Sequence, residues 1–348
     1  MRSYNGSEMS RDIGIDLGTS SVLVSMGGRG IALKEPSVVA VRRDTGEIVC
    51  IGEEARKILG RAPANIHVVK PLQDGVISQY ELAVKMLQYF LRKAIGTQII
   101  KPRIFICIPG DITEVEEKAV YDAATGAGYS RPMLISEPVA AAIGAGIDIS
   151  MPNGNLVVDI GGGTTDVAVI SLGGVIASKS IKIAGDKFDE AIVRYIRNLH
   201  NVLIGERTAE ELKRTIGTLT PGDPKYKDRY MDVTGRCLAR GLPKVVRVYP
   251  HDIKAALTDP INQILDAITE VIDNTPPELD GDIVSNGILL TGGGSLLAGL
   301  GEVVTSCIGV RARIPQNPDQ CVAIGTGKAM RFFSEGPTER ALYGRYLR

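Results

Sequence analysis

The sequence of 348 residues has few of the residues that build metal sites and disulfide frameworks. Its three histidines are too scattered for metal-ligand spacing. Its five cysteines are odd in number and form no C-x-x-C pair, so neither a zinc site nor a disulfide framework is indicated. We therefore expect free thiols and a reducing compartment.

An excess of charge, a long apolar run and the P-loop are also missing. Forty basic residues balance forty acidic residues, so nothing indicates nucleic acid as a partner recognised through bulk charge. No apolar run reaches about eighteen residues, so no transmembrane helix is expected. Residues 1–11 are polar and do not read as a signal peptide. Ala329 follows Gly327-Lys328 where the P-loop requires Ser or Thr, so phosphate would need another kind of loop.

Two stretches of the sequence, residues 13–24 and 157–170, are nearly alike. Each has a β-branched run, an Asp, an apolar residue, glycine, small hydroxyl residues and a second apolar run. The pattern predicts a strand, a tight glycine turn and a returning strand. Two ordinary hairpins are the simpler alternative, but the repetition at matching positions favours a duplicated domain with a polyphosphate between its halves.

The residues of these turns suit phosphate binding. Backbone N–H groups can surround a triphosphate only where no Cβ blocks their approach, which requires glycine. Carboxylates repel bare phosphate, so Asp16 and Asp159 indicate a Mg²⁺ ion, held through its waters. The hydroxyl groups that can add donors are those of Thr19, Ser20, Thr164 and Thr165.

A third glycine cluster, residues 292–294, follows the apolar run 287–290. The pattern predicts a strand that ends at a backbone without side chains, followed by a helix that begins near Ser295. Such a turn allows close approach of a flat base and ribose, or of a phosphate to a helix N-terminus. It is a candidate adenosine pocket.

Glu137 stands directly before Pro138, which suits the first position of a helix. Its carboxylate either favours the helix dipole, by about 0.3–1 kcal/mol, or lies near the γ-phosphate and acts as a general base that orients the attacking water. The physical chemistry of the residues leaves both interpretations open.

The remaining pattern predicts strands and helices in alternation. Ser78-Gln79-Tyr80-Glu81 and residues 113–116 read as capping boxes that open two helices, and a later helix is predicted over about 259–274. Because the alternation occurs around each hairpin, we expect an α/β fold with two large domains, each with a mixed sheet flanked by helices.

The paired Asp-Gly hairpins and the third glycine site resemble the actin/Hsp70/sugar-kinase superfamily. Residues 11–330 are similar to the MreB/Mbl bacterial actins in particular. Asp166 and residues 184–189 look more like the Mbl branch. The segments that carry the resemblance are 12–19, 35–40, 74–77, 137–138, 159–165, 204–210, 275–279 and 290–297.

The resemblance implies a cytoplasmic, actin-like duplicated ATPase that binds ATP and Mg²⁺. Such a protein polymerises with itself, in paired protofilaments, on the inner face of the cell membrane. It directs cell-wall elongation and rod cell shape beside membrane proteins of the RodZ, MreC and MreD kind, with no nucleic acid. Its ATP hydrolysis to ADP and phosphate would be slow and coupled to polymerisation, unlike that of a metabolic enzyme.

The resemblance also implies roles for individual residues. Asp16 and Asp159 would organise Mg²⁺, and Glu137 would activate water. The phosphates would be held by Gly18, Thr19, Ser20, Ser21, Gly161, Gly162, Gly163 and Thr164. Adenosine would be held by Glu206, Arg207, Thr208, Ala209, Gly292, Gly293, Gly294 and Ser295.

The four-subdomain plan of this family divides each domain into a large subdomain and a small inserted one. The ends, 1–11 and 341–348, are expected to be flexible. The expected ranges are 12–36, 74–150 and 318–340 for the first large subdomain, 37–73 for its small one, 151–182 and 246–317 for the second large subdomain, and 183–245 for its small one.

The sequence departs from the family pattern in three places. Ser136 stands where the family usually has a Glu before Glu137, which leaves the tuning of hydrolysis open. Residues 221–230 form a longer segment than usual, in a small subdomain that can face a neighbouring subunit, which leaves the filament contacts there open. The tail 331–348 matches nothing in the pattern.

Ile99-Ile100 stand before Lys101-Pro102, where MreB-like proteins often place two apolar residues that contact the membrane. The alternative is that they begin a core strand, since short apolar runs usually belong to strands. A sugar or small-metabolite kinase shares the hairpins but needs an Asp base in the first half, for which Asp111 is the one candidate. A plasmid-segregating actin is a further alternative.

Overall fold

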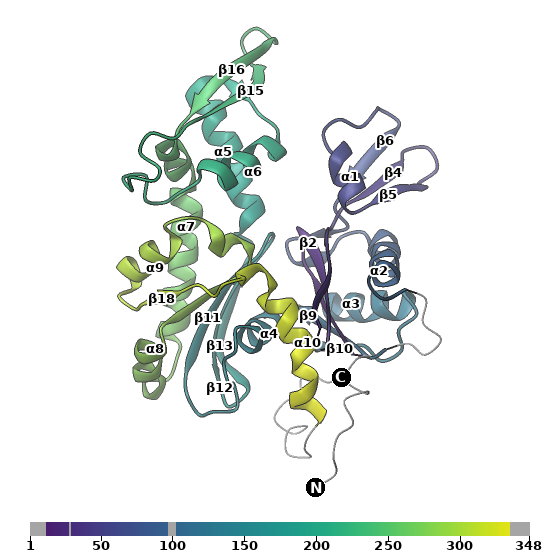
Figure 1. The fold of residues 1–348 in the computed structure, drawn as a ribbon, viewed down its shortest axis with the longest axis vertical. Coiled ribbons are helices and arrows are strands. Elements are labelled where there is room, and N and C mark those ends of the chain that lie inside the picture. Colours follow the sequence, from purple (N-terminus) through teal and green to yellow (C-terminus); the bar gives the residue numbers. More distant parts are fainter. Residues whose placement is uncertain (1–11, 28, 97–101, 335–348) are drawn as a thin grey trace.

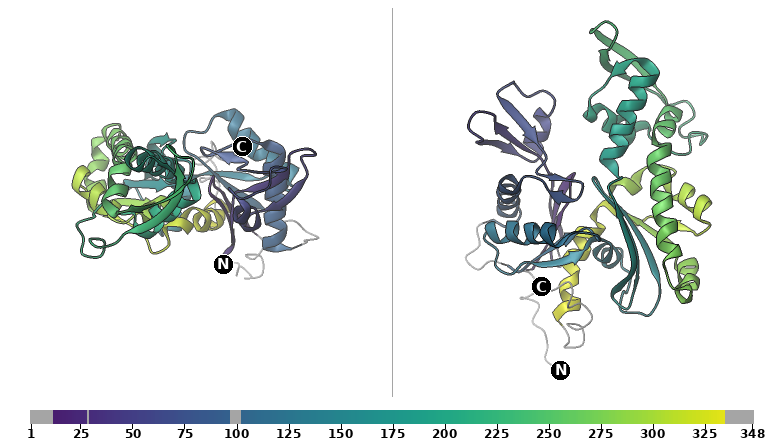
Figure 2. Two further views of the ribbon diagram at one scale, coloured as in Figure 1. Left: turned by 90° about the horizontal axis from the view of Figure 1, so that it is seen from above. Right: turned by 180° about the vertical axis from the view of Figure 1, so that it is seen from behind.

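The computed structural model describes residues 12–27, 29–96 and 102–334, and it consists of two halves that stand side by side (Figure 1). Each half has a large sheet below and a small sheet above, and the two further views of Figure 2 show the same separation. No helix in these described ranges is both long enough and apolar enough to cross a lipid bilayer.

The first large sheet has the strand order β3-β2-β1-β9-β10. Its centre is the predicted hairpin, in which β1 and β2 are antiparallel, and β9 lies parallel to β1 on the other side. The helices α2 and α3 pack against each other in this half. The bounds are β1 Ile13–Leu17, β2 Ser21–Met26, β3 Gly30–Pro36, β9 Ile104–Ile108, β10 Met133–Ser136, α2 Tyr80–Ile95 and α3 Glu114–Gly126.

The second large sheet repeats this arrangement strand by strand, in the order β13-β12-β11-β17-β18. The hairpin β11–β12 is again central, with β17 parallel to β11. The expected duplicated α/β fold is therefore confirmed. The bounds are β11 Asn155–Ile160, β12 Thr165–Ser171, β13 Gly174–Ile181, β17 Ile288–Thr291, β18 Ala312–Arg313, α5 Gly185–His200, α7 Pro250–Asp273, α8 Asp280–Asn286 and α9 Leu300–Ile308.

Each half also has a small three-stranded sheet at the upper end of Figure 1. The first lies beside α1, and the second lies beside α6. Their strands are β4 Val39–Arg42, β5 Ile48–Ile51 and β6 Ile66–Val69 in one half, and β14 Val202–Leu203, β15 Met231–Cys237 and β16 Pro243–Val248 in the other. The remaining elements are α1 Glu53–Ile58, β7 Leu72–Gln73, β8 Val76–Ile77, α6 Glu206–Ile216, η2 Pro277–Leu279, η3 Gly293–Leu296 and η4 Pro318–Gln320.

Helices α4 (Glu137–Gly144) and α10 (Cys321–Ser334) cross between the two large sheets. α4 packs on β11 and β12, whereas α10 packs on β1, β2 and β9. The crossing is a contact of backbone on backbone: a Cβ on Gly325 would lie 1.7 Å from the Ala140 carbonyl oxygen, and one on Gly144 would lie 1.8 Å from that of Cys321. This crossing joins the two halves at their base.

Several predicted helix ends are confirmed, and two are wrong. Thr113 caps α3 through a complete capping box with Glu116. Ser78 does not cap α2, because its hydroxyl donates to the Pro71 carbonyl (3.0 Å) and the helix begins at Tyr80 without a side-chain cap. The helix expected to begin near Asp259 begins at Pro250, as described next.

The early start of α7 has a local cause. Pro250 occupies the first turn, where a missing N–H costs nothing, and the Tyr249 N–H donates to Asp252 Oδ2 (2.9 Å). Pro260 lies inside the helix, so it marks neither the beginning nor the end of an element. Downstream, α10 continues to Ser334, so the first residues of the unplaced tail are helical. Ile99 and Ile100 lie outside the described residues.

Candidate functional site

The two hairpin turns predicted to bind phosphate meet each other across the two halves. A Cβ on Gly162 would lie 2.2 Å from Ser20 Oγ, and one on Gly163 would lie 2.6 Å from Thr19 Oγ1. Thr19 Oγ1 in turn accepts the Gly75 N–H (3.0 Å). Glycine is therefore required here because the opposite turn approaches so closely. The structure brings together the set Gly18, Thr19, Ser20 and Ser21 and the set Gly161, Gly162, Gly163 and Thr164.

Asp16 and Asp159 occupy matching positions near the ends of the central strands β1 and β11. Asp159 is buried, and its Oδ1 accepts the Thr291 hydroxyl (2.6 Å). Burial, together with the charges of Asp166 and Asp16, raises the pKa of Asp159 to about 7, against the lowering effect of the Thr291 hydroxyl. Burial also raises the pKa of Asp16 to about 6, against the lowering effect of the Cys107 thiol.

Glu137, the first residue of α4, faces the same group of carboxylates. Burial raises its pKa well above the usual range, and the nearby charges of Asp166, Asp16 and Asp159 act in the same direction. The structure therefore places four acidic side chains from both halves in one site. Ser136, at the family's Glu position, is buried beside them, and its Oγ has no hydrogen-bond partner among the described residues.

The donor set of this site fits a hard cation such as Mg²⁺. The groups are carboxylate oxygens, and burial raises the pKa of both Asp16 and Asp159, so a cation beside them would stabilise their charged forms. Within the described ranges, no three or more His, Cys, Asp or Glu side chains are close enough to hold a metal directly. The arrangement therefore fits a Mg²⁺ ion that keeps several of its waters, as predicted for Asp16 and Asp159.

In the third glycine cluster, Gly292 and Gly294 pack closely against another residue, whereas Gly293 does not. A Cβ on Gly292 would lie 2.2 Å from the Ile160 carbonyl oxygen, and one on Gly294 would lie 2.3 Å from Ile160 Cγ2. Gly293 is exposed and faces open space. Ser295 is buried and donates to the Gly292 carbonyl (2.7 Å), so it closes the turn. The helix predicted from Ser295 is wrong in kind, because the 3₁₀ turn η3 stands there and α9 begins at Leu300.

The other residues predicted to hold adenosine form the first turn of α6. Glu206 and Arg207 are exposed, Thr208 is half-buried and Ala209 is fully buried. The segments that follow α6 and η3 are joined, since the Leu219 N–H donates to the Ala298 carbonyl (2.8 Å). Thr165, expected to add a donor, instead donates to the Ile183 carbonyl (2.6 Å).

Three polar contacts cross between the halves above the glycine turns. Asp186, in the first turn of α5, pairs with Lys70 (2.9 Å) and accepts the Ser20 hydroxyl (3.3 Å). Higher up, Glu210 on α6 pairs with Arg56 on α1 (3.2 Å). These contacts join the two halves above the turns.

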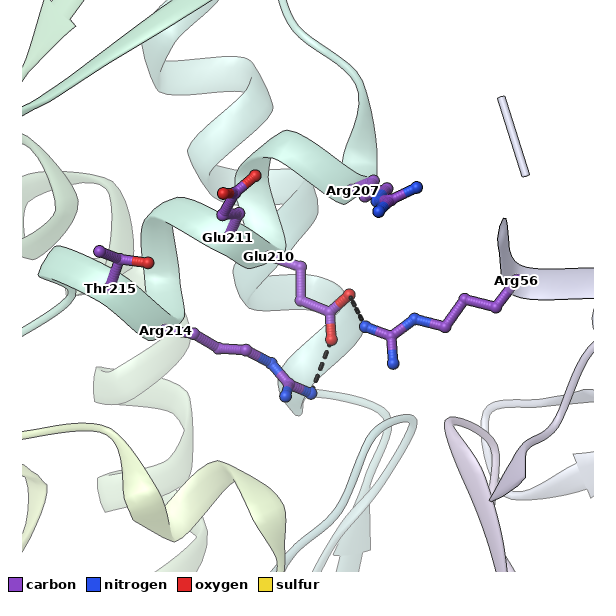
Figure 3. A pocket seen from close by; sticks show the side chains of 6 residues that line it. All are labelled: Arg56, Arg207, Glu210, Glu211, Arg214 and Thr215. Atoms are coloured by element: carbon purple, nitrogen blue, oxygen red, sulfur yellow. Dashed lines mark hydrogen bonds and ion pairs between the residues drawn. The ribbon is translucent and has the colours of Figure 1, made fainter. Parts of the chain in front are cut away.

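A pocket of about 280 Å³ lies at this upper contact (Figure 3). Figure 3 shows Glu210 between two arginines, Arg56 of α1 and Arg214 of its own helix. The pocket includes Arg207 of the predicted adenosine set. Its lining residues are Arg56, Arg207, Glu210, Glu211, Arg214 and Thr215.

Asp166 is one of the site residues that the sequence-based prediction missed. It lies opposite Asp159 in the β11–β12 ladder, whereas the matching ladder position in the first hairpin pairs Asp16 with Leu23. A charged residue at a position that is apolar in the other copy was the available signal. The prediction also missed Lys70, Asp186 and Glu210, because no local sequence pattern indicates ion pairs between residues far apart in the chain.

Comparisons with known proteins agree with this geometry. The family model described as MreB/Mbl protein matches residues 10–336. The chain is 48% identical to cell shape-determining protein Mbl of Bacillus cereus over 318 residues, covering 91% of this chain and 95% of the relative. It is 44% identical to cell shape-determining protein MreB of Escherichia coli over 327 residues, covering 92% and 93%.

Solved structures show the same similarity. The structure of MreB 5 of Spiroplasma citri bound to AMPPNP superposes with a TM-score of 0.86 at 36% identity, covering 92% of this chain and 96% of that one. The MamK double helical filament superposes with a TM-score of 0.77 at 23% identity, covering 94% and 99%, which supports the fold alone.

Proposed function

The chain belongs to the MreB/Mbl family, and on this premise we propose that it is an ATP-binding bacterial actin whose membrane-associated filaments direct cell-wall elongation and rod cell shape. The observation that carries the proposal is the meeting of two glycine turns beside four acidic side chains. Two relatives are named cell shape-determining proteins, which supports the cellular role.

The nucleotide is assigned to the interface between the halves. Solved MreB structures of Spiroplasma citri are described as bound to AMPPNP and to ADP, which supports ATP as the ligand. The phosphates lie against residues 18–21 and 161–164, the two turns that meet where glycine lets the backbones approach closely. Adenosine lies against the first turn of α6 and the open face at Gly293.

The acidic side chains have different chemical roles. Asp16 and Asp159 would hold Mg²⁺ through its waters, and the ion would supply positive charge that neutralises the polyphosphate. Glu137 accepts the proton of the attacking water, since its raised pKa makes its carboxylate a better base near neutral pH. The Lys70–Asp186 pair keeps the halves closed around the phosphates.

We also propose that this chain assembles into filaments and that it has the four subdomains given above. The MamK relative is described as a double helical filament, and the fold is shared with it. The β15–β16 hairpin extends from the upper end of the second half and carries exposed apolar side chains, with Leu242 and Val245 each 63% exposed. Such side chains suit a contact between subunits. The elongation proteins of the RodZ, MreC and MreD kind remain proposed partners.

Sedimentation with liposomes tests the whole proposal. We expect wild-type protein to pellet with liposomes more strongly with ATP and Mg²⁺ than without, and Asp159→Ala to lose this nucleotide dependence because its metal-organising carboxylate is gone. Filaments should pellet without lipid at higher protein concentration. A chain that stays monomeric in every condition, and turns over ATP only when a sugar is added, would favour a kinase instead.

Membrane contact is proposed for Ile99 and Ile100. Burying two Ile side chains in lipid gives about 3–6 kcal/mol, most of which a single subunit loses to restricted motion. A filament that presents many copies binds firmly through avidity. The double variant Ile99→Ser/Ile100→Ser should therefore reduce liposome pelleting at least about tenfold while filaments still form. Ile99→Leu/Ile100→Leu keeps the apolar area and should bind normally, and equal pelleting of the Ser variant and wild type would refute the contact.

A further inference from the structure

Ser37 is a buried serine that holds the first phosphate turn (residues 18–21) through two hydrogen bonds. It is 1% exposed and lies between β3 of the first large sheet and β4 of the small one. Its hydroxyl donates to the Gly18 carbonyl (2.6 Å), and its backbone N–H donates to the Ser20 carbonyl (3.1 Å). A single residue therefore occupies two carbonyl oxygens of this turn.

These two contacts decide where the neighbouring N–H groups point. The peptides of the turn are trans, and in a planar trans peptide the C=O and the N–H point in opposite directions. The Gly18 carbonyl shares its peptide unit with the Thr19 N–H. In the same way, the Ser20 carbonyl shares a peptide unit with the Ser21 N–H. Both N–H groups therefore point away from Ser37, which leaves them free to face an anion on the other side of the turn.

The second phosphate turn (residues 161–164) is held in the same way from the matching place in the chain. The Gly185 N–H donates to the Gly161 carbonyl (3.2 Å), and the Asp186 N–H donates to the Gly162 carbonyl (2.8 Å). Both donors begin α5, the element that follows β13, whereas the donor in the first half follows β3. Because both copies of the duplicated fold occupy turn carbonyls from this place, the contact belongs to the phosphate turn and not to the packing of one hairpin.

The two copies differ in one contact, which makes the first turn accessible to a test. In the second half both donors are backbone N–H groups, whereas in the first half one donor is the Ser37 hydroxyl. Substitution by alanine keeps the backbone N–H but removes the hydroxyl. The Gly18 carbonyl then loses its partner, and the peptide between Gly18 and Thr19 is free to rotate.

We propose that Ser37 is a positioning residue for ATP binding, whose hydroxyl fixes the peptide between Gly18 and Thr19 with its N–H toward the phosphates. This inference rests on the proposed ATP-binding function. Ser37 acts through the turn, which is arranged before the nucleotide arrives. A turn fixed in advance loses less conformational entropy on binding, so the hydroxyl strengthens binding of the phosphates and leaves binding of the adenosine part unchanged.

The test measures the affinity of the full chain for ATP with Mg²⁺ and for adenosine, together with the melting temperature. Ser37→Ala should weaken ATP binding about 5–50-fold, while adenosine binding stays within about twofold of wild type. Ser37→Thr keeps the hydroxyl and should bind ATP within about threefold of wild type.

Ser25→Ala is the matched control. Ser25 lies near the end of β2 that is remote from the turn, and it is 2% exposed. Its hydroxyl donates to the Ala323 carbonyl over the same distance (2.6 Å). This variant also takes a buried hydroxyl away from a backbone carbonyl, so it should lower the melting temperature to a similar extent but bind ATP as wild type does.

Wild-type ATP affinity in Ser37→Ala overturns the inference, and so does an equal loss in Ser25→Ala, which would show a general effect of stability. An equal loss of adenosine affinity, or a loss that a folded Ser37→Thr retains, also overturns it. If Ser37→Ala does not fold, hydrogen exchange of the wild-type protein decides. ATP should slow exchange of the Ser37 N–H at least about threefold more than adenosine does, and equal slowing would overturn the inference. Wild-type protein that binds no ATP overturns the proposed function as well.

Discussion

Glu137→Gln is expected to lower ATP hydrolysis by about 10²–10⁴-fold, the usual contribution of a general base, while ATP remains bound. Glutamine has the shape of the acid but cannot accept the proton of water. Phosphate release in filaments and ATP affinity, measured on the same preparation, separate the chemical step from binding. The exposed Glu114→Gln on α3 is the matched control and should behave as wild type.

The same variant decides between the two interpretations of Glu137. If its carboxylate served only the dipole of α4, the variant would lose about 0.3–1 kcal/mol of stability and no activity. As the proposed base, it is a buried acid whose pKa is raised, which means that its charge destabilises the folded state. Removal of that charge should therefore raise the melting temperature while activity falls. Unchanged turnover in Glu137→Gln would disprove the catalytic role.

Gly325→Ala is expected to destabilise the protein by roughly 3 kcal/mol or more, as overpacking against rigid backbone does. The added Cβ would lie 1.7 Å from the Ala140 carbonyl oxygen and 2.7 Å from the Gly144 nitrogen. Neither atom belongs to a flexible side chain, so α4 and α10 would have to separate. Urea unfolding of the purified chain measures the change.

Gly301→Ala, on α9, is the matched control for this prediction. Its Cβ would meet Ile314 Cδ1 at 3.6 Å, an ordinary contact, and its helical conformation suits alanine. It should be neutral or stabilise the protein by about 0.4–1 kcal/mol, because alanine restricts the unfolded chain. Similar stability of Gly325→Ala and wild type would mean that the two helices do not cross backbone to backbone.

The elements that could be predicted from the sequence are those with a local signature. Thr113 and Glu116 stand three residues apart and form their capping box, and Asp16 marks a hairpin whose strands follow directly in the chain. The same local reasoning fails at Ser78, whose hydroxyl is taken by the Pro71 carbonyl. It fails again at the start of α7, which was predicted near Asp259, because the helix begins at Pro250 and continues through Pro260.

The site was predictable only where its residues repeat. Asp16 and Asp159 could be recognised as a pair because the two hairpins match. In contrast, Lys70 and Asp186 are 116 residues apart and belong to no repeat. Their pairing depends on how one half is placed against the other, which no local pattern encodes. At Gly292 and Gly294, glycine also admits the close approach of Ile160, which no local pattern in the sequence could show.

Glu210 has two arginine partners, and only one of them belongs to the opposite half. Arg56 pairs with it across the interface, and Arg214 pairs with it from the next turn of α6 (2.7 Å). If the halves separated, Glu210 would still pair with Arg214, so its carboxylate would not be left without an ion-pair partner. A partly exposed pair contributes about 0.2–1 kcal/mol, which is close to thermal energy. This contact therefore favours the arrangement in which the halves touch, while adding little to the free energy needed to separate them.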